Sequence, residues 1–556
     1  MTELLVVIVV GFVVIAAATV FGPRLGIAAP LVLVAIGVAA SFLPMFGSIE
    51  IEPEWILEGI LPPLLYSSAV SMPTMNFRRE FGAISGLSVL LVVGSALLLG
   101  VFFMLVIPEL GFAWGVALGA IVSPTDAVAT SIIKRTSVSR RVVAILDGES
   151  LLNDATALVL LRTAIVAAAA SFSFWGALGT FGYSVIVAIA IGLAVGWANL
   201  AVRKRVTDST VNTVISFTVP FLASVPATLL GGSGLVAAVV AGLVTGVRAP
   251  RMLSPQNRLS DSQNWRTIEL VLEGVVFLTM GIQIKTIVLN VEQDHAGVWP
   301  ALLVAVGALV LTVLVRAAYV APLLRFLSSR AKLRQRMQPR MQSMHEKMST
   351  PEGKQETLEK ATARGRRTSE RDLDRFATRI TRLIADAEYF LRAPLGWREG
   401  TAVVWAGMRG AVTVAAAQTL PTETPQRSVL VLIAFAVAAL SLLVQGGTIG
   451  PLLRAIAPEV DEAAAKEQTN SEVKRIFELL KASAETVPEP PQPEGQPNLE
   501  TFAVAKQHRL AVIEAQRAAL LDARDNGTFD ADVLASALAT LDATQIDIEM
   551  RGMLVE

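Results

Sequence analysis

Long apolar segments, each close to twenty residues, constrain this chain more than any other feature of its sequence. A helix needs about 20 consecutive apolar residues to cross the hydrocarbon core of a bilayer. The 556-residue chain is 53% hydrophobic, and its apolar residues gather in segments of that length. We therefore predict an all-α membrane protein that is surrounded by a lipid bilayer. The thirteen predicted transmembrane helices are 4–22, 26–45, 54–72, 84–107, 112–133, 141–170, 174–200, 210–229, 233–248, 267–288, 298–323, 397–420 and 428–456.

The loops between these segments alternate in charge. Basic loops such as 203–205 and 325–340 fall on one side, and acidic or neutral loops such as 108–109 and 292–294 fall on the other. Because Lys and Arg are enriched in cytoplasmic loops, we expect the N-terminus outside and the C-terminus in the cytoplasm of a bacterial cell, with the chain in the inner (cell) membrane. The first apolar run has neither a basic region before it nor a small-residue cleavage site, so we interpret it as a span and not as a signal peptide.

Two polar segments interrupt or follow the predicted spans, and we place both in the cytoplasm. The second contains a Pro-rich linker at 487–497 and then two amphipathic runs, 499–523 and 530–550, which predict a helical hairpin. Both segments are interpreted as solvated helix or, alternatively, as docking regions for a cytoplasmic regulator. The predicted domains are spans 1–11 in 1–323, a hydrophilic loop in 324–396, spans 12 and 13 in 397–457, and a regulatory tail in 458–556.

Composition excludes several classes of function. The chain has no cysteine and only three histidines, all in polar stretches, which argues against thiolate chemistry and against Cys or His metal centres. The 47 basic residues balance 47 acidic ones, so charge points to no nucleic-acid partner. Serines inside the spans have no evident base other than carboxylates, so a hydrolase is disfavoured. We expect no enzyme activity and no cofactor.

The fifth predicted span carries the polar stretch 123–126 near its middle. Pro124 removes a backbone donor and clashes with the preceding turn, so the helix should break there. Free backbone groups would then lie beside Thr125 and Asp126. Unwound backbone next to a carboxylate is a plausible cation site, and the alternative is a proline kink in which Asp126 caps the second half-helix.

The sixth predicted span is the most polar. Helical spacing places Asp147, Ser150 and Asp154 on one face and Glu149 and Asn153 on the adjacent one. Asp154 should lie about 20 Å from the start of the span, near the midplane. Asp147 is shallower and could line a water-filled cytoplasmic funnel. Because ionisable residues are costly inside a membrane, these side chains are candidates for function.

The twelfth predicted span carries Arg409 between Gly407 and Gly410. An arginine at this depth stays charged and needs a carboxylate, and we expect Glu149 to be its partner in a structural ion pair. The two interrupted spans, 5 and 12, run in opposite directions. That arrangement predicts inverted repeats with two crossed broken helices, which place a binding site at the crossing.

Taken together, these motifs resemble the monovalent cation:proton antiporter-1 family, the sodium/proton exchangers of bacteria and animals. The matching stretches are 61–65 (LPPLL), 123–126 (SPTD), 148–155 (GESLLNDA), 277–281 (FLTMG) and 407–411 (GMRGA).

The resemblance implies a homodimer in which a core domain moves against a dimerisation domain. It implies that Asp154 binds the cation and the proton, and that the transported ions, Na+ (or Li+ or K+) and H+, need no further cofactor. The pair Asn153 and Asp154 is the family's mark of electroneutral one-for-one exchange. The implied cation ligands are Asp154, Ser150 and the Thr125 backbone, aided by Asp126 and Asn153, and the implied ion pair is Glu149 with Arg409.

The chain departs from the family pattern at two positions. Ser67 stands where the family has a glutamate, so a potential cation-ligating carboxylate is missing. Glu273 stands where an amide is expected. We expect Glu273 to lie nearer the cytoplasmic surface beside a basic residue, and the alternative is that it replaces the acid missing at Ser67.

These observations favour an electroneutral sodium (lithium)/proton antiporter. A potassium/proton antiporter of the same fold remains open, as does a transport-inactive sensor built on a transporter scaffold. An anion or organic-solute carrier is less favoured, because it would need several positively charged groups near the midplane. In this sequence the acidic residues inside the spans outnumber the single deep arginine that we identify, Arg409.

Overall fold

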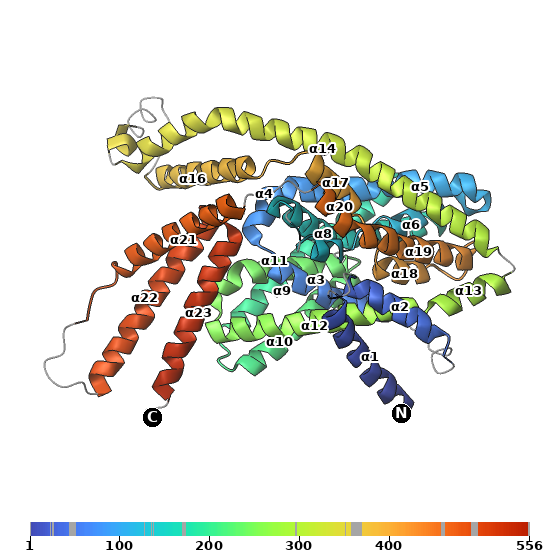
Figure 1. The fold of residues 1–556 in the computed structure, drawn as a ribbon, viewed down its shortest axis with the longest axis horizontal. Helices are drawn as coiled ribbons and strands as arrows, with labels where there is room; N and C mark the ends of the chain where they lie inside the picture. The colour runs from blue at the N-terminus through green and yellow to red at the C-terminus, as the bar shows by residue number, and fades with distance from the viewer. Residues whose placement is uncertain are drawn as a thin grey trace. The chain divides into compact units, whose positions relative to one another are not determined.

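The computed structural model describes residues 2–22, 24, 27–43, 52–126, 128–134, 136, 138–169, 174–294, 297–350, 352–356, 370–456, 462–490 and 499–553. Within these residues every regular element is a helix, and no strand is present (Figure 1). The all-α fold class is therefore confirmed. The greater part of the predicted Pro-rich linker 487–497 lies outside the described residues.

The chain divides into two compact units, which we describe separately. The first contains Met1–Met252, Leu259–Leu323 and Trp397–Pro458. The second contains Leu253–Arg258, Leu324–Gly396 and Glu459–Glu556. These limits fall where the sequence changes from apolar to polar segments. That the polar segments lie in the cytoplasm stays a prediction.

The first unit is built from apolar helices with short connections. Its helices are α1 (Thr2–Phe21), α2 (Ala29–Ser41), η3 (Trp55–Ile60), α3 (Leu61–Ser71), α4 (Thr74–Ser85), η4 (Gly86–Leu91), α5 (Val92–Val106), η5 (Pro108–Leu110), α6 (Gly111–Val122), α7 (Val128–Ile133), α8 (Arg140–Ala169), α9 (Phe174–Arg203), α10 (Ser209–Leu229), α11 (Gly234–Met252), α12 (Pro255–Ile282), α13 (Ile284–Gln293), the first part of α14 (Val298–Ser349), α17 (Trp397–Trp405), α18 (Ala411–Gln418), α19 (Arg427–Ser441), η6 (Leu442–Gly446) and α20 (Gly447–Ile456).

Eight helical stretches of the described residues are long and apolar enough to cross a membrane. Every predicted span overlaps one of the helices above, while the number of thirteen spans stays a prediction. The eight stretches are Thr74–Val106, Arg140–Ala168, Leu178–Arg203, Ser209–Leu229, Gly234–Met252, Pro255–Gln293, Val298–Met348 and Arg427–Ile456.

Small residues bring α5 and α6 into close contact. A Cβ atom added to Gly119 would lie 2.4 Å from the carbonyl oxygen of Ala96, and one added to Gly115 would lie 2.6 Å from that of Gly100. Helices in membranes commonly pack through such small residues, because the backbones can then approach closely. This contact anchors α6, whose C-terminal end leads into the first helix break.

Both predicted helix breaks are present. One separates α6 from α7 around Pro124, and the other separates α17 from α18 at 406–410. The two unwound segments meet at a place that we call the crossing, since the backbone N–H of Asp126 donates to the carbonyl oxygen of Met408 at 2.7 Å. That the two helices cross as a whole stays a prediction. The inverted-repeat relation between them stays a prediction.

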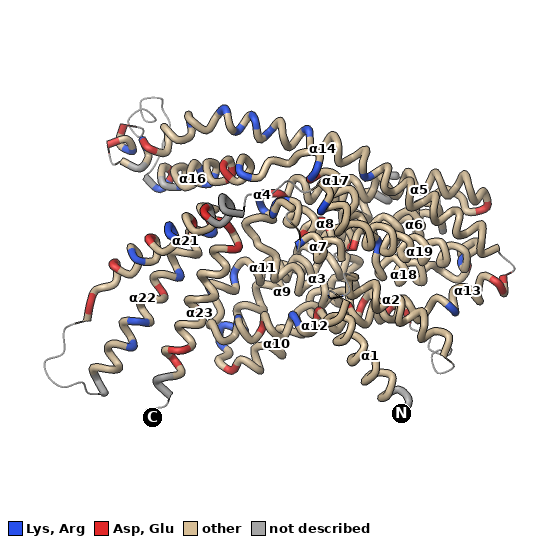
Figure 2. The backbone as a smooth tube through the Cα atoms, viewed as in Figure 1, with Lys and Arg blue, Asp and Glu red and all other residues tan. Residues whose placement is uncertain are grey.

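The second unit consists of charged helices with a small apolar core. Figure 2 shows Lys, Arg, Asp and Glu crowded along its helices. The helices α21, α22 and α23 pack side by side around a core that contains Ile476, Ile513 and Leu534. The predicted hairpin is confirmed, with Gly527 at the turn in a left-handed conformation (φ 74°). The helices of this unit are the second part of α14, α16 (Glu370–Arg392), α21 (Glu462–Ala484), α22 (Leu499–Asn526) and α23 (Ala531–Met553).

Candidate functional site

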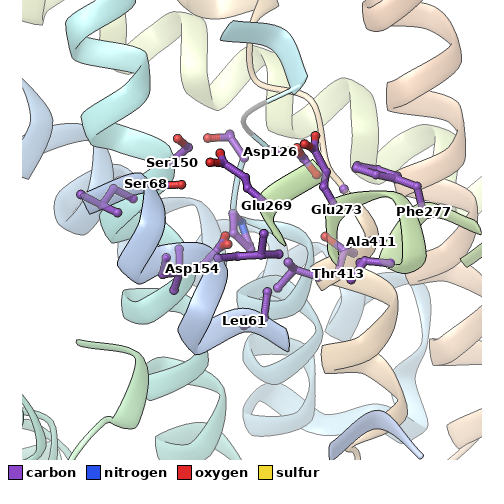
Figure 3. Close-up of a pocket in the computed structure, with 18 residues that line it drawn as sticks. Leu61, Ser68, Asp126, Ser150, Asp154, Glu269, Glu273, Phe277, Ala411 and Thr413 are labelled. Carbon is purple, nitrogen blue, oxygen red and sulfur yellow. The ribbon is translucent and has the colours of Figure 1, made fainter. Parts of the chain in front are cut away.

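A cavity of about 130 Å³ lies at the helix crossing in the first unit. Its walls come from α3, α8, α12, the break between α6 and α7, and the start of α18 (Figure 3). Four carboxylates line it, and among the described residues no Lys or Arg does. Such a lining favours a cation and disfavours an anion. The four carboxylates belong to Asp126, Asp154, Glu269 and Glu273.

Asp126 lies in the break between α6 and α7, where its carboxylate contacts the start of α7 and the start of α18. Its Oδ1 accepts a hydrogen bond from the backbone N–H of Val128 at 2.9 Å, in the first turn of α7. Its carboxylate also lies against Gly410, where an added Cβ would be 1.4 Å from Oδ2. Because α18 begins at Ala411, the carboxylate faces the N-terminal ends of two half-helices, where a negative charge is stabilised. Asp126 therefore both caps a helix and lines the cavity.

Asn153 fixes the unwound backbone beside the cavity. Its Nδ2 donates to the carbonyl oxygen of Thr125 at 3.1 Å and to the Thr125 Oγ1 at 2.6 Å. The Thr125 hydroxyl in turn donates to Glu149 Oε1 at 3.1 Å. Thr125 lines the cavity, whereas Asn153 is fully buried and does not. Asn153 thus holds the Thr125 backbone in place, and Thr125 faces the cavity.

Asp154 and Ser150 reach the cavity from the same face of α8, as their helical spacing predicts. The Ser150 hydroxyl donates to the carbonyl oxygen of Asp147 at 3.1 Å, so its oxygen can still accept or coordinate. Asp147 itself does not line the cavity and forms an ion pair with Lys134 at 3.0 Å. The structure thus brings together Asp154 and Ser150 but places Asp147 with a surface lysine.

The buried partner of Glu149 is Arg316 of α14, and the predicted pair of Glu149 with Arg409 is wrong. Two hydrogen bonds join the Arg316 guanidinium to the Glu149 carboxylate, Nη1 to Oε1 at 2.5 Å and Nη2 to Oε2 at 2.7 Å. The Nε of Arg316 also donates to the carbonyl oxygen of Val403 at 2.9 Å, near the end of α17. A bidentate pair of this kind satisfies both charges where water is excluded.

Arg409 binds backbone carbonyls in place of a carboxylate. Its Nε donates to the carbonyl oxygen of Val122 at 2.9 Å, and its Nη1 donates to that of Gly407. Val122 is the last residue of α6, so the guanidinium sits at the negative end of a half-helix, a position that favours a cation. Sequence reasoning overlooked Arg316, although an arginine inside the apolar segment 298–323 was a usable signal.

We expected Glu273 to lie near the cytoplasmic surface beside a basic residue, but its side chain lines the cavity. The charged groups that act on it are Asp126 and Glu269. Glu269, one turn earlier on α12, also lines the cavity and was not singled out from the sequence. Its Oε2 accepts a hydrogen bond from the Ser67 hydroxyl at 3.1 Å. The i, i+4 spacing of the two glutamates was the signal that could have identified it.

Comparison with known proteins identifies the family. The profile of the family described as sodium/hydrogen exchanger, transmembrane, matches residues 9–344 and 375–455. The chain belongs to the sodium/hydrogen exchanger family. Its members are antiporters that exchange sodium for protons across a membrane, so the resemblance inferred from the motifs is confirmed.

Individual relatives agree with this family assignment, and one solved structure shares the fold. A Na+/H+ exchanger of Mycobacterium tuberculosis is 27% identical over 474 residues, which cover 83% of this chain and 76% of the relative. An antiporter of Bacillus subtilis named for sodium, potassium, lithium and rubidium/H+ exchange is 29% identical over 278 residues, 48% of this chain and 41% of the relative. The structure of the sodium proton antiporter MjNhaP1 from Methanocaldococcus jannaschii shares the fold, with a TM-score of 0.55 and 16% identity over 82% of this chain and 100% of that chain.

Proposed function

We propose that this chain exchanges Na+ or Li+ for protons, one cation for one proton, by alternating access at Asp154. One observation carries the proposal most directly: the Asp154 side chain lines a cavity at the crossing of two broken helices, and no described Lys or Arg lines that cavity. The family membership supports it as well. The proposal includes a homodimer in a bacterial cell membrane, with the N-terminus outside and the C-terminus in the cytoplasm.

The residues around the cavity can supply oxygen ligands to a monovalent cation. We assign the Asp154 carboxylate, the Ser150 hydroxyl and the Thr125 carbonyl as the direct ligands, since all three residues line the cavity. Asn153 holds the Thr125 carbonyl in place. Asp126 lines the same cavity and contributes through its charge and through water. Hard cations prefer such oxygen ligands.

Competition at one carboxylate couples the two fluxes. Asp154 can hold a cation or a proton but not both, so each loaded form carries the same charge. The remaining charged groups near the cavity, such as Glu149 with Arg316, keep the same partners whichever ion Asp154 holds. Arg316 and Arg409 are engaged with Glu149 and with backbone carbonyls, so neither is left to neutralise Asp154. One-for-one exchange without net charge transfer follows from this competition.

Potassium is the second candidate for the transported cation. The relative from Bacillus subtilis is named for exchange of sodium, potassium, lithium and rubidium. The cavity offers carboxylate, hydroxyl and carbonyl oxygens without a described amine, and these ligands suit any alkali cation. We therefore treat the choice among Na+, Li+ and K+ as a question for measurement.

Proton flux in everted membrane vesicles tests the proposed function. Addition of Na+ or Li+ should dissipate an imposed pH gradient, and Asp154→Asn should abolish this response because the exchangeable charge is gone. The matched control is Asp294→Asn, an exposed aspartate of the same unit, which should respond like the wild type. The rate should not depend on an imposed membrane potential.

Each possible result has a clear meaning. Full exchange by Asp154→Asn protein would contradict the assignment of this residue. A response to K+ alone would establish potassium/proton exchange in place of sodium/proton exchange. If the wild type responds to no alkali cation at any pH, the result supports the third alternative from the sequence analysis, a transport-inactive sensor built on a transporter scaffold.

A further inference from the structure

Glu269 is a cavity carboxylate that the exchange mechanism above does not use. It lies on α12 one turn before Glu273, and both side chains line the cavity with Asp126 and Asp154. Figure 3 shows Asp126, Glu269 and Glu273 grouped in one part of the cavity, with Asp154 below them in this view. Two acids at i, i+4 share a helix face. They therefore form a row along the face of α12 that lines the cavity.

Glu269 lies nearer the polar end of this row than Glu273. The charged groups that act on Glu269 include Lys134, Arg266 and Asp147, and the Lys134 side chain is 54% exposed. Those that act on Glu273 are Asp126 and Glu269 itself. Four residues of helix separate the two glutamates by about 6 Å along α12. Glu269 therefore lies nearer than Glu273 to the side of the first unit that carries Lys134, and we take this side as the one from which cations enter.

Ser67 holds the Glu269 carboxylate in this position. The Ser67 hydroxyl is buried on α3 and donates to Glu269 Oε2 at 3.1 Å. From the family resemblance we expected a glutamate at position 67, where this sequence has a serine. A carboxylate is nevertheless present at this point in space, because Glu269 of α12 reaches it from the facing helix.

We propose that Glu269 is the entrance carboxylate of the ion path and supplies from α12 the acid that position 67 of α3 lacks. The proposal rests on the proposed cation exchange and adds a residue to that site. A carboxylate at the mouth of a narrow cavity attracts cations from solution and raises their local concentration. It does so without being the group that exchanges a cation for a proton, which remains Asp154.

Cation-dependent proton flux in everted vesicles tests this role, because these vesicles expose the predicted cytoplasmic face to added Na+. Glu269→Gln should raise the apparent KM for Na+ about fivefold to tenfold, as expected for loss of one nearby charge in a partly water-excluded site, and leave the maximal rate within about twofold. Glu292→Gln is the matched control, an exposed glutamate of the same unit, and should leave KM unchanged.

A variant that exchanges the side chains of Ser67 and Glu269 tests whether the apparent KM depends on the position of the carboxylate in space or on the helix that carries it. The double variant Ser67→Glu with Glu269→Ser should return the apparent KM to within about twofold of the wild type. If it reaches the membrane and keeps the raised KM, the link to position 67 is wrong. Should it not reach the membrane, Glu269→Asp decides, because the retained charge should keep KM near the wild-type value.

Failure of this proposal is distinguishable from failure of the proposed function. An unchanged KM in Glu269→Gln, with exchange still abolished by Asp154→Asn, would overturn the entrance role and leave the function standing. Complete loss of flux in Glu269→Gln protein that reaches the membrane would also overturn it, since an entrance group is not essential at saturating Na+. A KM in Glu269→Asp as high as in Glu269→Gln would contradict the proposal as well.

Discussion

Glu149 and Arg316 form a buried ion pair at the crossing. Both side chains are almost entirely buried, at 2% and 3% exposure. Burying two charges is costly, and removal of one partner leaves the other uncompensated, at a cost of about 3–5 kcal/mol. Thr125 adds a further hydrogen bond to the same carboxylate. The pair therefore links α8 and α14 to the unwound segment that lines the cavity.

Thermal unfolding of purified variants tests which arginine is the partner of Glu149. Arg316→Met should destabilise the protein strongly, and adding Glu149→Gln should restore part of the loss because the uncompensated charge is removed. In an Arg409→Met background, Glu149→Gln should instead restore little or none of the loss, since Arg409 is hydrogen-bonded to backbone carbonyls and not to Glu149. The reverse result, with rescue only in the Arg409→Met background, would support the ion pair expected from the sequence.

In both broken helices, each half-helix end at the break faces a side chain whose charge is opposite to the partial charge of that end. The C-terminal ends of α6 and α17 face Arg409 and Arg316, and the N-terminal ends of α7 and α18 face Asp126. Each helix end carries a partial charge of the opposite sign to its side chain. Breaking a helix inside a membrane leaves backbone groups without partners, and these three side chains, with Asn153, satisfy or offset them.

Gly410→Ala tests how tightly the crossing is packed. The added methyl group would lie 1.4 Å from Asp126 Oδ2, so the carboxylate must move away from the start of α18. We expect cation-dependent proton flux to fall at least about tenfold, because a displacement of this size near a reacting group has large effects. Gly447→Ala is the matched control, since nothing lies within 4 Å of a Cβ there, and flux like the wild type is expected. Full activity of Gly410→Ala would show that Asp126 need not keep this position.

At the scale of the whole molecule, the cavity lined by carboxylates and the charged helices belong to different units. Every residue that lines the cavity lies in the first unit. The second unit has its own apolar core and its own ion pairs, such as Arg392 with Glu472 at 2.5 Å. The first unit therefore contains all the residues that we propose as ion ligands, and a regulatory role for the tail, or a partner that binds it, stays a prediction.

Deletion of 459–556 tests this separation. We expect the shortened protein to retain cation-dependent proton flux within about threefold of the full chain, because domains with separate cores fold largely independently. The α16 segment should become more sensitive to limited proteolysis, since Arg392 loses Glu472 and Arg382 loses its hydrogen bond to Asn526. Complete loss of flux in a protein that still reaches the membrane would show that the tail is needed for transport itself.

The sequence by itself determined the features that depend on local chemistry. Apolar runs of helical length predicted the membrane helices, because backbone groups in lipid must be paired within the segment. Pro124 and the glycines around Arg409 predicted the two breaks, and the spacing of Ser150 and Asp154 predicted their common face on α8. In each case the physical cause lies within a few residues of its effect.

Only the tertiary structure decided which distant side chains meet. Arg316 and Arg409 are both arginines inside predicted spans, and nothing in their spacing tells which of them reaches Glu149. That choice follows from how α8, α14 and the second broken helix pack together. The contact between Ser67 and Glu269 likewise joins residues 202 positions apart. The periodicity of a helix shows which face a side chain occupies, and the packing of neighbouring helices decides what that face touches.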